Sequence, residues 1–338
     1  MTTKKIGMQT AALANPPALA SWANVVGKKE GEGPLADTFD YIDGDDTFGE
    51  STWEKSESAM QKQALGLALN KAGQAAASLD WIFAGDLLNQ CIGSSFAARG
   101  QDVPFFGLYG ACSTMGEGLA LAAMTLDGGF GEWAGVVVSS HFCTAERQYR
   151  TPLEYGSQRT PTAQWTATAA GAVIVTNEIR PGPRVARVTV GKVVDKGIKD
   201  ANNMGAAMAP AAYSTLKAHF EDTALSPDYY DLIVTGDLGS LGHEIVCDFF
   251  ARDGVELANY NDCGLLLFDR EQQDVHAGAS GCGCSASVLC GYLLPGLLAG
   301  RWKRILFCPT GALHSPTATM QGESIPGVCH AIALEGGK

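Results

Sequence analysis

A cysteine in a strand-to-helix turn is the residue of this chain best placed for nucleophilic chemistry. Cys112 stands between Gly110 and Ser113 in the stretch FGLYGACSTMGEGLALAAM (106–124), after a short apolar run and before a segment rich in helix formers. Unpaired N–H groups at a helix N-terminus stabilise a thiolate and lower the pKa of a cysteine. The same turn also suits a small buried cysteine, which is usually inert. Both roles stay open for Cys112.

Polar residues follow other predicted strands in the same way. Asp86, His141, Asp237 and Thr310 come, like Cys112, directly after short apolar runs. Ligands of α/β sheets bind where the carboxyl ends of strands meet, so we expect these five side chains to converge on one cleft. His141 is the strongest single candidate after the cysteine, and its alternative is a satisfied structural histidine.

The acidic and amide side chains of two turns have two candidate roles. Asp86 and Asn89 lie in the turn GDLLNQ, and Asp237 lies in a matching GDLG. Such residues commonly hold a turn by hydrogen bonds to the neighbouring backbone. Their oxygens also suit Ca²⁺, which matters if a ligand arrives as a calcium chelate. Turn stabilisation is the simpler of the two roles.

Two segments of the chain repeat one pattern. LDWIFAGDLLNQ matches YDLIVTGDLGSL, with Asp80 corresponding to Asp231. Further along, a small-residue helix that starts at Cys112 corresponds to one that starts at Cys284. Two pairs in the same order predict two copies of one β-α-β-α-β unit with different loops inserted. The alternative is a chance likeness, because short buried strands resemble one another.

The alternation of strands and helices predicts an α/β fold with mainly parallel sheets that are covered on both faces. The repeat divides the chain into an N-terminal extension at 1–50 packed on the fold, a first half at 51–177 and a second half at 178–338. The first half opens with a predicted helix whose capping box is formed by Ser51 and Glu54.

Composition and charge exclude several classes of protein. Of the 338 residues, 46% are hydrophobic and 18% charged, as in an ordinary soluble α/β protein. A net charge of −12 argues against a nucleic-acid partner, which needs a basic surface. The ten cysteines, many within apolar runs, favour reduced thiols. The C-x-C spacing of Cys282 and Cys284 is not a zinc motif, so no metal or cofactor is predicted.

The apolar segments predict an intracellular protein without a membrane anchor. Pro16 and Pro17 interrupt what would be the core of a signal peptide. No run approaches the roughly 18 apolar residues that a spanning helix requires. Any association with a membrane is therefore expected to be peripheral.

The cysteine turn and the duplication resemble the thiolase superfamily. The resemblance rests on Cys112 in GACST, on GCGCSAS (281–287) and on the two similar halves. It implies a thiolase-like five-layered αβαβα fold with pseudo-twofold symmetry between the halves. In that superfamily the cysteine accepts an acyl group with help from a histidine and an asparagine. This chain has Gly236 and Cys282 at their positions, so the resemblance implies a non-enzyme with a vestigial nucleophile.

An enzyme is the alternative. It would transfer an acyl group from a coenzyme A or carrier-protein thioester through Cys112, with His243 or His141 as the base. The simpler interpretation of His243 is an exposed loop histidine, because loops lie mainly on the surface.

Further segments resemble one group within this superfamily, a family of bacterial sporulation proteins. They are, in chain order, GPLADTFD, AGDLLNQ, GACST, SSHFCTAERQYRTPLEYG, AMAPAA and TGALHSPT. The resemblance implies binding of dipicolinic acid, a pyridine dicarboxylate, during its uptake into the developing spore. It also implies a component of a membrane transport system, peripheral on the spore inner membrane, with integral membrane proteins as partners. Thiolase-like proteins usually pair along an edge strand, so a homodimer is expected.

A dicarboxylate entering an acidic protein needs local positive charge and hydrogen-bond donors. Arg147, Arg150 and Arg159 share one loop and suit carboxylates, although a solvated loop or a subunit contact is the alternative. Helix N-termini also bind carboxylates. The aromatic candidates for stacking on the ligand ring are Trp165, Tyr109 and Phe142. The residues predicted to bind the ligand are Cys112, Ser113, His141, Asp86, Asn89, Arg147, Cys282 and Ser285.

Overall fold

Two groups of five strands with the same spatial order form the frame of the computed structural model, which describes residues 4–150, 153–156 and 158–337. The first group runs in the order β6 (Phe105–Leu108), β5 (Trp81–Gly85), β7 (Trp133–Ser140), β9 (Ala169–Thr176) and β3 (Ala18–Val26). The second runs in the order β12 (Tyr260–Asp262), β11 (Leu232–Thr235), β14 (Arg304–Cys308), β17 (Ala331–Glu335) and β10 (Arg184–Thr189). The groups join where Arg184 of β10 pairs with Ala18 of β3.

The direction of pairing is the same in both groups. β5 is parallel to β6 and β7, as β11 is to β12 and β14. β9 is antiparallel to its neighbours β7 and β3, as β17 is to β14 and β10. The predicted duplication is therefore confirmed strand by strand.

A matched pair of aspartates fixes the central strands. Oδ2 of Asp80, just before β5, accepts the N–H groups of Glu132 and Trp133 at 2.7 and 3.0 Å, where β7 begins. Oδ2 of Asp231, just before β11, accepts those of Lys303 and Arg304 at 2.7 and 2.8 Å, where β14 begins. The repeat extends from sequence to individual hydrogen bonds.

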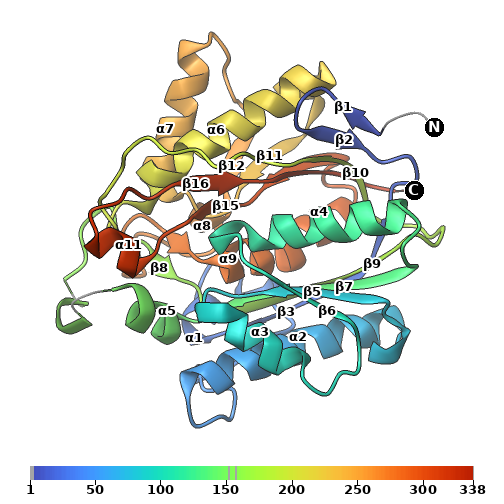
Figure 1. The fold of residues 1–338 in the computed structure, drawn as a ribbon, viewed down its shortest axis with the longest axis horizontal. Coiled ribbons are helices and arrows are strands. Elements are labelled where there is room, and N and C mark those ends of the chain that lie inside the picture. The colour runs from blue at the N-terminus through green and yellow to red at the C-terminus, as the bar shows by residue number, and fades with distance from the viewer. Residues whose placement is uncertain (1–3, 151–152, 157, 338) are drawn as a thin grey trace.

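Helices complete a five-layered αβαβα arrangement, as predicted (Figure 1). α2 (Trp53–Ala72) and α3 (Ile92–Ala98) cover the outer face of the first sheet. α6 (Met204–Thr223) and α7 (Gly239–Arg252) cover that of the second. α4 (Thr114–Asp127) and α9 (Cys282–Val288) lie between the sheets, and a π-helical turn (Leu289–Leu293) joins α9 to α10 (Leu294–Leu298).

The first long helix does not use the predicted capping box. α2 begins at Trp53 with Thr52 as its N-cap, and no side chain bonds to the cap. Glu54 instead forms an ion pair with Arg147. The C-terminus agrees with the sequence, because Gly73 takes a left-handed conformation at φ 68° that favours glycine.

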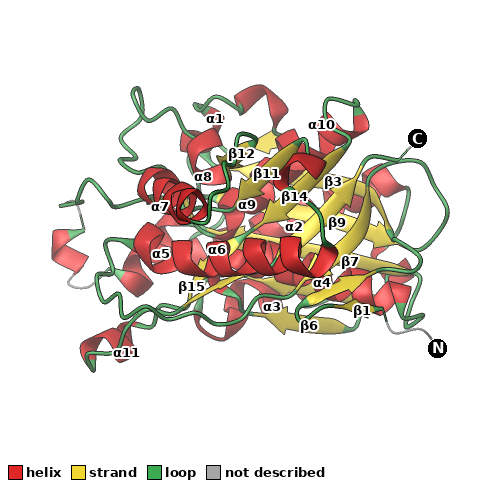
Figure 2. Ribbon diagram, turned by 90° about the horizontal axis from the view of Figure 1, so that it is seen from above, coloured by secondary structure: helices red, strands yellow, loops and turns green. Residues whose placement is uncertain are grey.

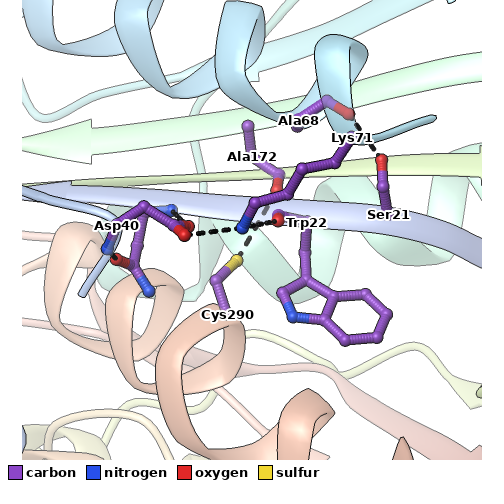
Figure 3. Close-up of polar contacts among 8 residues, drawn as sticks. Ser21, Trp22, Asp40, Ala68, Lys71, Ala172 and Cys290 are labelled. Atoms are coloured by element: carbon purple, nitrogen blue, oxygen red, sulfur yellow. Dashed lines mark hydrogen bonds and ion pairs between the residues drawn. The ribbon is translucent and has the colours of Figure 1, made fainter. Parts of the chain in front are cut away.

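Residues 18–26, assigned to an N-terminal extension from the sequence, form β3 in the interior of the sheet. β3 lies between β9 and β10, and most of its residues are buried. Figure 3 shows how α2 holds it: Lys71 Nζ donates to the Trp22 carbonyl oxygen at 3.0 Å and to Asp40 Oδ1 at 2.6 Å. The Ser21 hydroxyl donates to the Ala68 carbonyl oxygen at 2.6 Å. This strand completes the first sheet, so the extension is not a separate part.

Shorter elements gather at the end of the molecule that lies far from both termini (Figure 2). They are α5 (Phe142–Tyr149), β8 (Trp165–Thr166), β13 (Ala279–Ser280), β15 (Thr310–Ala312), α11 (Pro316–Met320) and β16 (Gly327–Cys329). β8 pairs with β13, and β15 pairs with β16. In the described ranges no helix is both long and apolar enough to span a bilayer.

Candidate binding cleft

A cleft of about 190 Å³ opens among these shorter elements. Its walls come from α5, the segment before β8, the start of α6, β15, α11 and the turn before α4. Apolar side chains provide much of the lining, and Met204, Met208 and Met320 are among them. Both repeats contribute walls, so the cleft lies between the halves.

Close packing shapes the turn that carries Cys112. The residue lies in a 3₁₀ turn (Ala111–Ser113) that leads into α4. Ala111 has φ 49°, a left-handed conformation that costs about 1 kcal/mol or more for a residue with a Cβ. A Cβ on Gly311 of β15 would overlap the Gly110 carbonyl oxygen. The turn places the buried Cys112 side chain on the cleft wall.

The Cys112 thiol is not activated as a nucleophile. Burial raises the pKa of Cys112 well above its usual value, and the neighbouring Asp237 and Cys282 raise it further. The group is therefore a protonated thiol at neutral pH, with the carboxyl of Asp237 beside it. The lowered pKa typical of a helix N-terminus is not found here, because loss of hydration outweighs the helix dipole.

Asp237 is the acidic group behind Cys112. Its fully buried carboxyl accepts three hydrogen bonds and lies beside the Cys112 thiol. Oδ2 accepts the Gly281 N–H at 2.9 Å and the Ser280 hydroxyl at 3.2 Å, and Oδ1 accepts the Thr310 hydroxyl at 3.1 Å. Burial raises the pKa of Asp237 to about 7. Three of the five predicted strand-end residues thus meet at one place.

Two buried side chains of the cleft carry polar atoms without a partner. Gln164 and His314 both line the cleft, and each is 8% exposed. Gln164 Nε2 donates to the carbonyl oxygens of Asp237 and Ala279, both at 2.7 Å, which fixes the amide and leaves Oε1 unpaired. His314 Nδ1 is also buried and unpaired.

The His314 ring presents its other nitrogen as a hydrogen-bond donor. Burial lowers the pKa of His314, so the ring is neutral at pH 7. A buried N–H without an acceptor costs more than an unpaired lone pair, and this places the proton on Nε2 rather than on the buried Nδ1. The Tyr149 ring, 5.4 Å away between centroids, packs against the imidazole.

An arginine and two tyrosines form the wall on the α5 side. Arg150 pairs with Glu146, with Nε–Oε2 at 2.5 Å and Nη2–Oε1 at 2.9 Å, and Nη1 donates to Asn202 Oδ1 at 3.1 Å. The Tyr149 hydroxyl donates to a backbone carbonyl at 2.6 Å, so it accepts the Tyr109 hydroxyl at 2.8 Å. Arg150 is thus the described cationic side chain on the cleft wall.

Of the residues predicted to bind a ligand, Cys112 lines the cleft and the other seven lie elsewhere. Ser113, Cys282 and Ser285 are buried at the two helix N-termini, where each side chain donates to a nearby backbone carbonyl. These groups are already satisfied inside the protein, because the helices are deeper in the core than the sequence suggests.

Asp86 and His141 hold local structure. Asp86 Oδ1 accepts the Leu88 N–H at 2.8 Å, and Oδ2 accepts the Ser94 N–H at 2.7 Å and its hydroxyl at 2.5 Å. His141 caps α5: Nδ1 accepts the N–H two residues on at 3.1 Å, and Nε2 bonds to the Asp46 carbonyl oxygen at 2.9 Å. Asp86 therefore stabilises a turn, and His141 is a structural histidine whose ring nitrogens both have partners.

Of the remaining polar candidates, Asn89 and Arg147 lie on the surface, whereas the Arg159 side chain is only 8% exposed. Asn89 is exposed, and its backbone N–H donates to Gln148 Oε1 at 3.1 Å. Arg147 is exposed and paired with Glu54. Arg159 pairs with Asp274. The arginine loop therefore brings Arg150, but not its two neighbours, to the cleft.

Two aromatic candidates and one histidine are engaged with other rings. Phe142 and Trp165 stack on each other, with centroids 3.8 Å apart and planes 7° from parallel, and Tyr109 is the candidate that lines the cleft. His243 lies in helix α7 rather than in a loop, and stacks on Tyr260 at 4.4 Å. Neither His243 nor His141 lines the cleft.

Among the polar side chains of the cleft that sequence reasoning missed are Gln164, His314 and Tyr149. His314 and Tyr149 lie in the segments TGALHSPT and TAERQYRTPLEYG, whose specificity already marked them. Both residues lie far along the chain from Cys112, so the sequence does not show that they line the same cleft. Gln164 stands in a polar loop with no motif. Within the described residues, no cluster of three or more His, Cys, Asp or Glu side chains is arranged to hold a metal ion.

Comparison with known proteins assigns this arrangement to a family. A family model described as stage V sporulation protein AD (SpoVAD) matches residues 7–335. Stage V sporulation protein AD of Bacillus subtilis (strain 168) is 42% identical over 334 residues, which cover 98% of each chain. The match spans the turn of Cys112 and every wall of the cleft.

Solved structures with similar folds are more distant in sequence. Xanthomonas campestris OleA E117D has a TM-score of 0.62 at 15% identity, over 99% of each chain. The 3-oxoacyl-[acyl-carrier-protein] synthase III of Aquifex aeolicus VF5 has a TM-score of 0.56 at 13% identity, over 94% of this chain and 99% of that chain. These likenesses show the thiolase-like fold.

Proposed function

The chain belongs to the stage V sporulation protein AD family, a family of sporulation proteins, and we propose that it binds dipicolinic acid in the Cys112 cleft. The binding serves uptake of this pyridine dicarboxylate into the developing spore. The observation that carries the proposal is the cleft itself, which combines a buried hydrogen-bond donor and an arginine with apolar walls.

The size of the cleft favours a small ligand. Its volume of about 190 Å³ is below the roughly 300–1,000 Å³ of clefts that hold drug-sized molecules. A single ring with two carboxyl groups suits this space better than a long acyl chain with its carrier.

The polar groups support a ligand that carries carboxylates. Among the described residues the His314 ring has no hydrogen-bond partner, and a carboxylate oxygen is a suitable acceptor for its N–H. Arg150 is held by Glu146 and Asn202 in a fixed orientation, so its remaining N–H groups can bind a carboxylate without loss of rotamer freedom. The Tyr149 ring and the methionine side chains offer flat and adaptable apolar contacts for the pyridine ring.

The chemistry of Cys112 supports a binder rather than an enzyme. Its thiol has a raised pKa, and the position of the superfamily's histidine is Gly236, where a Cβ would lie 2.9 Å from Pro309 Cα. The position of the asparagine is Cys282, whose thiol is bonded to a backbone carbonyl. Asp237 is the group that remains beside Cys112.

Acyl transfer is the second candidate, and the Cys112–Asp237 contact is the observation in its favour, since a buried carboxyl with a pKa near 7 has the strength of a general base. Incubation with an acyl-coenzyme A and measurement of the intact mass separate the two functions. We expect no adduct. A stable acyl group on Cys112 would favour the enzyme.

Membership of the family supports a proposal about membrane partners. We propose that the protein docks, peripherally on the spore inner membrane, on integral membrane proteins of the same transport system. Membrane flotation of spore-forming cells with and without those partners tests this, with association expected only when they are present.

We also propose that two copies pair along β6. This strand is the last in its sheet, and Phe106 on it is 49% exposed. Phe96 of α3 and Met124 of α4 are exposed on the neighbouring elements. Sedimentation at several concentrations should show a dimer, and Phe106→Asp should shift it to the monomer.

Calorimetric titration tests the proposed ligand directly. We expect dipicolinic acid to bind with at least micromolar strength, about −8 kcal/mol. Picolinic acid, with one carboxyl group, should bind at least tenfold more weakly, because it cannot use both polar contacts. Equal affinity for the two acids, or no heat with either, would contradict the proposal.

A further inference from the structure

We propose that a dicarboxylate entering the Cys112 cleft is bound together with one proton, which Asp237 takes from solvent. The inference rests on the proposed function and concerns how the same cleft accepts negative charge. It starts from the position of one buried carboxyl directly behind the cleft wall.

Asp237 is separated from the cleft by a single layer of side chains. Cys112 and Ser280 both line the cleft, and both adjoin Asp237 on their inner side. The Ser280 hydroxyl donates to Asp237 Oδ2 at 3.2 Å, and the Cys112 thiol lies close enough for Asp237 to raise its pKa. When Asp237 is ionised, these two groups and the Thr310 hydroxyl turn their hydrogens toward it. Their lone pairs then face the cleft, which is unfavourable for an incoming carboxylate.

The surroundings of Asp237 do not neutralise a negative charge. Asp262, at the end of β12, is a second buried carboxyl that raises the pKa of Asp237. The other titratable groups that face it are thiols of the α4 turn, α8 (Cys263–Leu266) and α9, namely Cys112, Cys263, Cys282 and Cys284. Among the described residues, no lysine or arginine forms an ion pair with either carboxyl. Arg150, on the opposite wall, is already paired with Glu146.

A ligand with two carboxylates therefore brings like charge toward a buried carboxylate, which raises the pKa of that group further. The pKa of Asp237 already lies near 7, so the added repulsion keeps it protonated above neutral pH. The proton comes from the buffer, and no covalent bond changes elsewhere. Because Oδ2 must still accept the Gly281 N–H, the proton binds to Oδ1.

Protonation reverses the hydrogen bonds of the wall. Oδ1–H donates to Thr310 Oγ1, which until then was the donor. The neutral carboxyl holds Ser280 and Cys112 more weakly, because charge-assisted bonds are about twice as strong as neutral ones. Their hydrogens become free to turn toward the ligand, so the wall changes from an acceptor surface to a donor surface.

Asp237→Asn should reproduce the protonated state. The amide keeps an oxygen for the Gly281 N–H and places Nδ2 where Oδ1–H would donate to Thr310. The matched control is Glu57→Gln, because burial raises the pKa of Glu57 to about 8 and it does not line the cleft. The partners of Glu57 are hydroxyls of Ser139 and Thr144, which can also reverse their hydrogen bonds.

The experiment is titration of the full chain with dipicolinic acid in buffers of different ionisation enthalpy, at pH 6 to 9. At pH 8 the wild type and Glu57→Gln should take up close to one proton per ligand, and their affinity should fall up to tenfold per pH unit above neutrality. Asp237→Asn should take up almost none and keep its pH 6 affinity at pH 9. Circular dichroism checks that each variant is folded.

Each other result overturns the inference. Binding by the wild type without proton uptake would leave the proposed function intact and remove this coupling. Uptake that persists in Asp237→Asn but disappears in His314→Gln would place the proton on the histidine. Uptake unchanged in both variants would place it on the ligand. No binding at any pH would overturn the proposed function and the coupling together.

Discussion

Asp86 and Asp237 occupy equivalent strand ends in the two halves, yet their surroundings are opposite in kind. Asp86 accepts two backbone N–H groups and one hydroxyl, all from its own half. Asp237 accepts one backbone N–H, and its other partners are two hydroxyls and the Cys112 thiol, which comes from the first half. Backbone N–H groups can only donate, whereas hydroxyls and thiols can exchange donor and acceptor roles.

The difference shows how one duplicated position acquires two uses. Fixed donors make Asp86 a turn-holding group that does not line the cleft. Reversible partners let Asp237 change its protonation state while every group stays satisfied. The repeat thus provides a buried carboxyl in each half, and the neighbours determine whether it can respond to a ligand.

The largest effect expected from this comparison is steric. Cys112→Leu should reduce affinity for dipicolinic acid by at least 100-fold, because the added atoms fill the cleft beside Asp237. Calorimetry measures the loss, and thermal unfolding checks that the fold persists. If the variant binds as tightly as the wild type, the ligand lies elsewhere.

The next largest effect is a difference in protein stability between substitutions of the two aspartates. Asp86→Asn should lower the free energy of unfolding by about 1–3 kcal/mol. The amide nitrogen, itself a donor, would face the backbone N–H of Leu88 or of Ser94, which cannot accept a hydrogen bond. Asp237→Asn should cost clearly less. Urea denaturation measures both, and equal losses would contradict the distinction between fixed and reversible partners.

A smaller effect on ligand affinity should distinguish His314 from His141. His314→Asn should weaken dipicolinic acid binding by about tenfold, the loss of one hydrogen bond to a charged group. His141→Asn should leave the affinity unchanged and keep a cap on α5, since asparagine is a good N-cap residue. Titration of both variants is the measurement. A binding defect in His141→Asn would return that residue to the site.

The smallest expected change is at the cysteine itself. Cys112→Ser should alter the affinity by no more than about threefold, because the hydroxyl keeps a polar group beside Asp237 and occupies less space. An acylating enzyme would instead lose all activity with this substitution. The same calorimetric titration decides between the two.

The sequence predicts the frame of the molecule well because the frame is a repeat. Asp80 and Asp231 mark equivalent positions, and buried strands without polar interruptions reveal both sheets. The sequence does not place β3 in the first half, because ALASWANVV lies far along the chain from its partner β9. Antiparallel closure of this kind depends on contacts that no local pattern records.

The cleft was harder to predict because its residues come from loops. Cys112 was found through its turn, and its neighbours Asp237 and Thr310 through strand ends. The raised pKa of the Cys112 thiol depends on burial and on a carboxyl from the other half, which no spacing reveals. His141 has the residue type expected of a ligand contact, but its two ring nitrogens are used at a helix start.

The central layer has a consequence for the origin of the chain. α4 of the first half contacts β17 of the second, and α9 of the second contacts β7 and β9 of the first. A half on its own would expose the inner face of its helix, which here includes fully buried Met115 and Leu119. Such a face needs a partner in water. One half alone would therefore need a second copy to cover this face, and the duplication supplies that cover within a single chain.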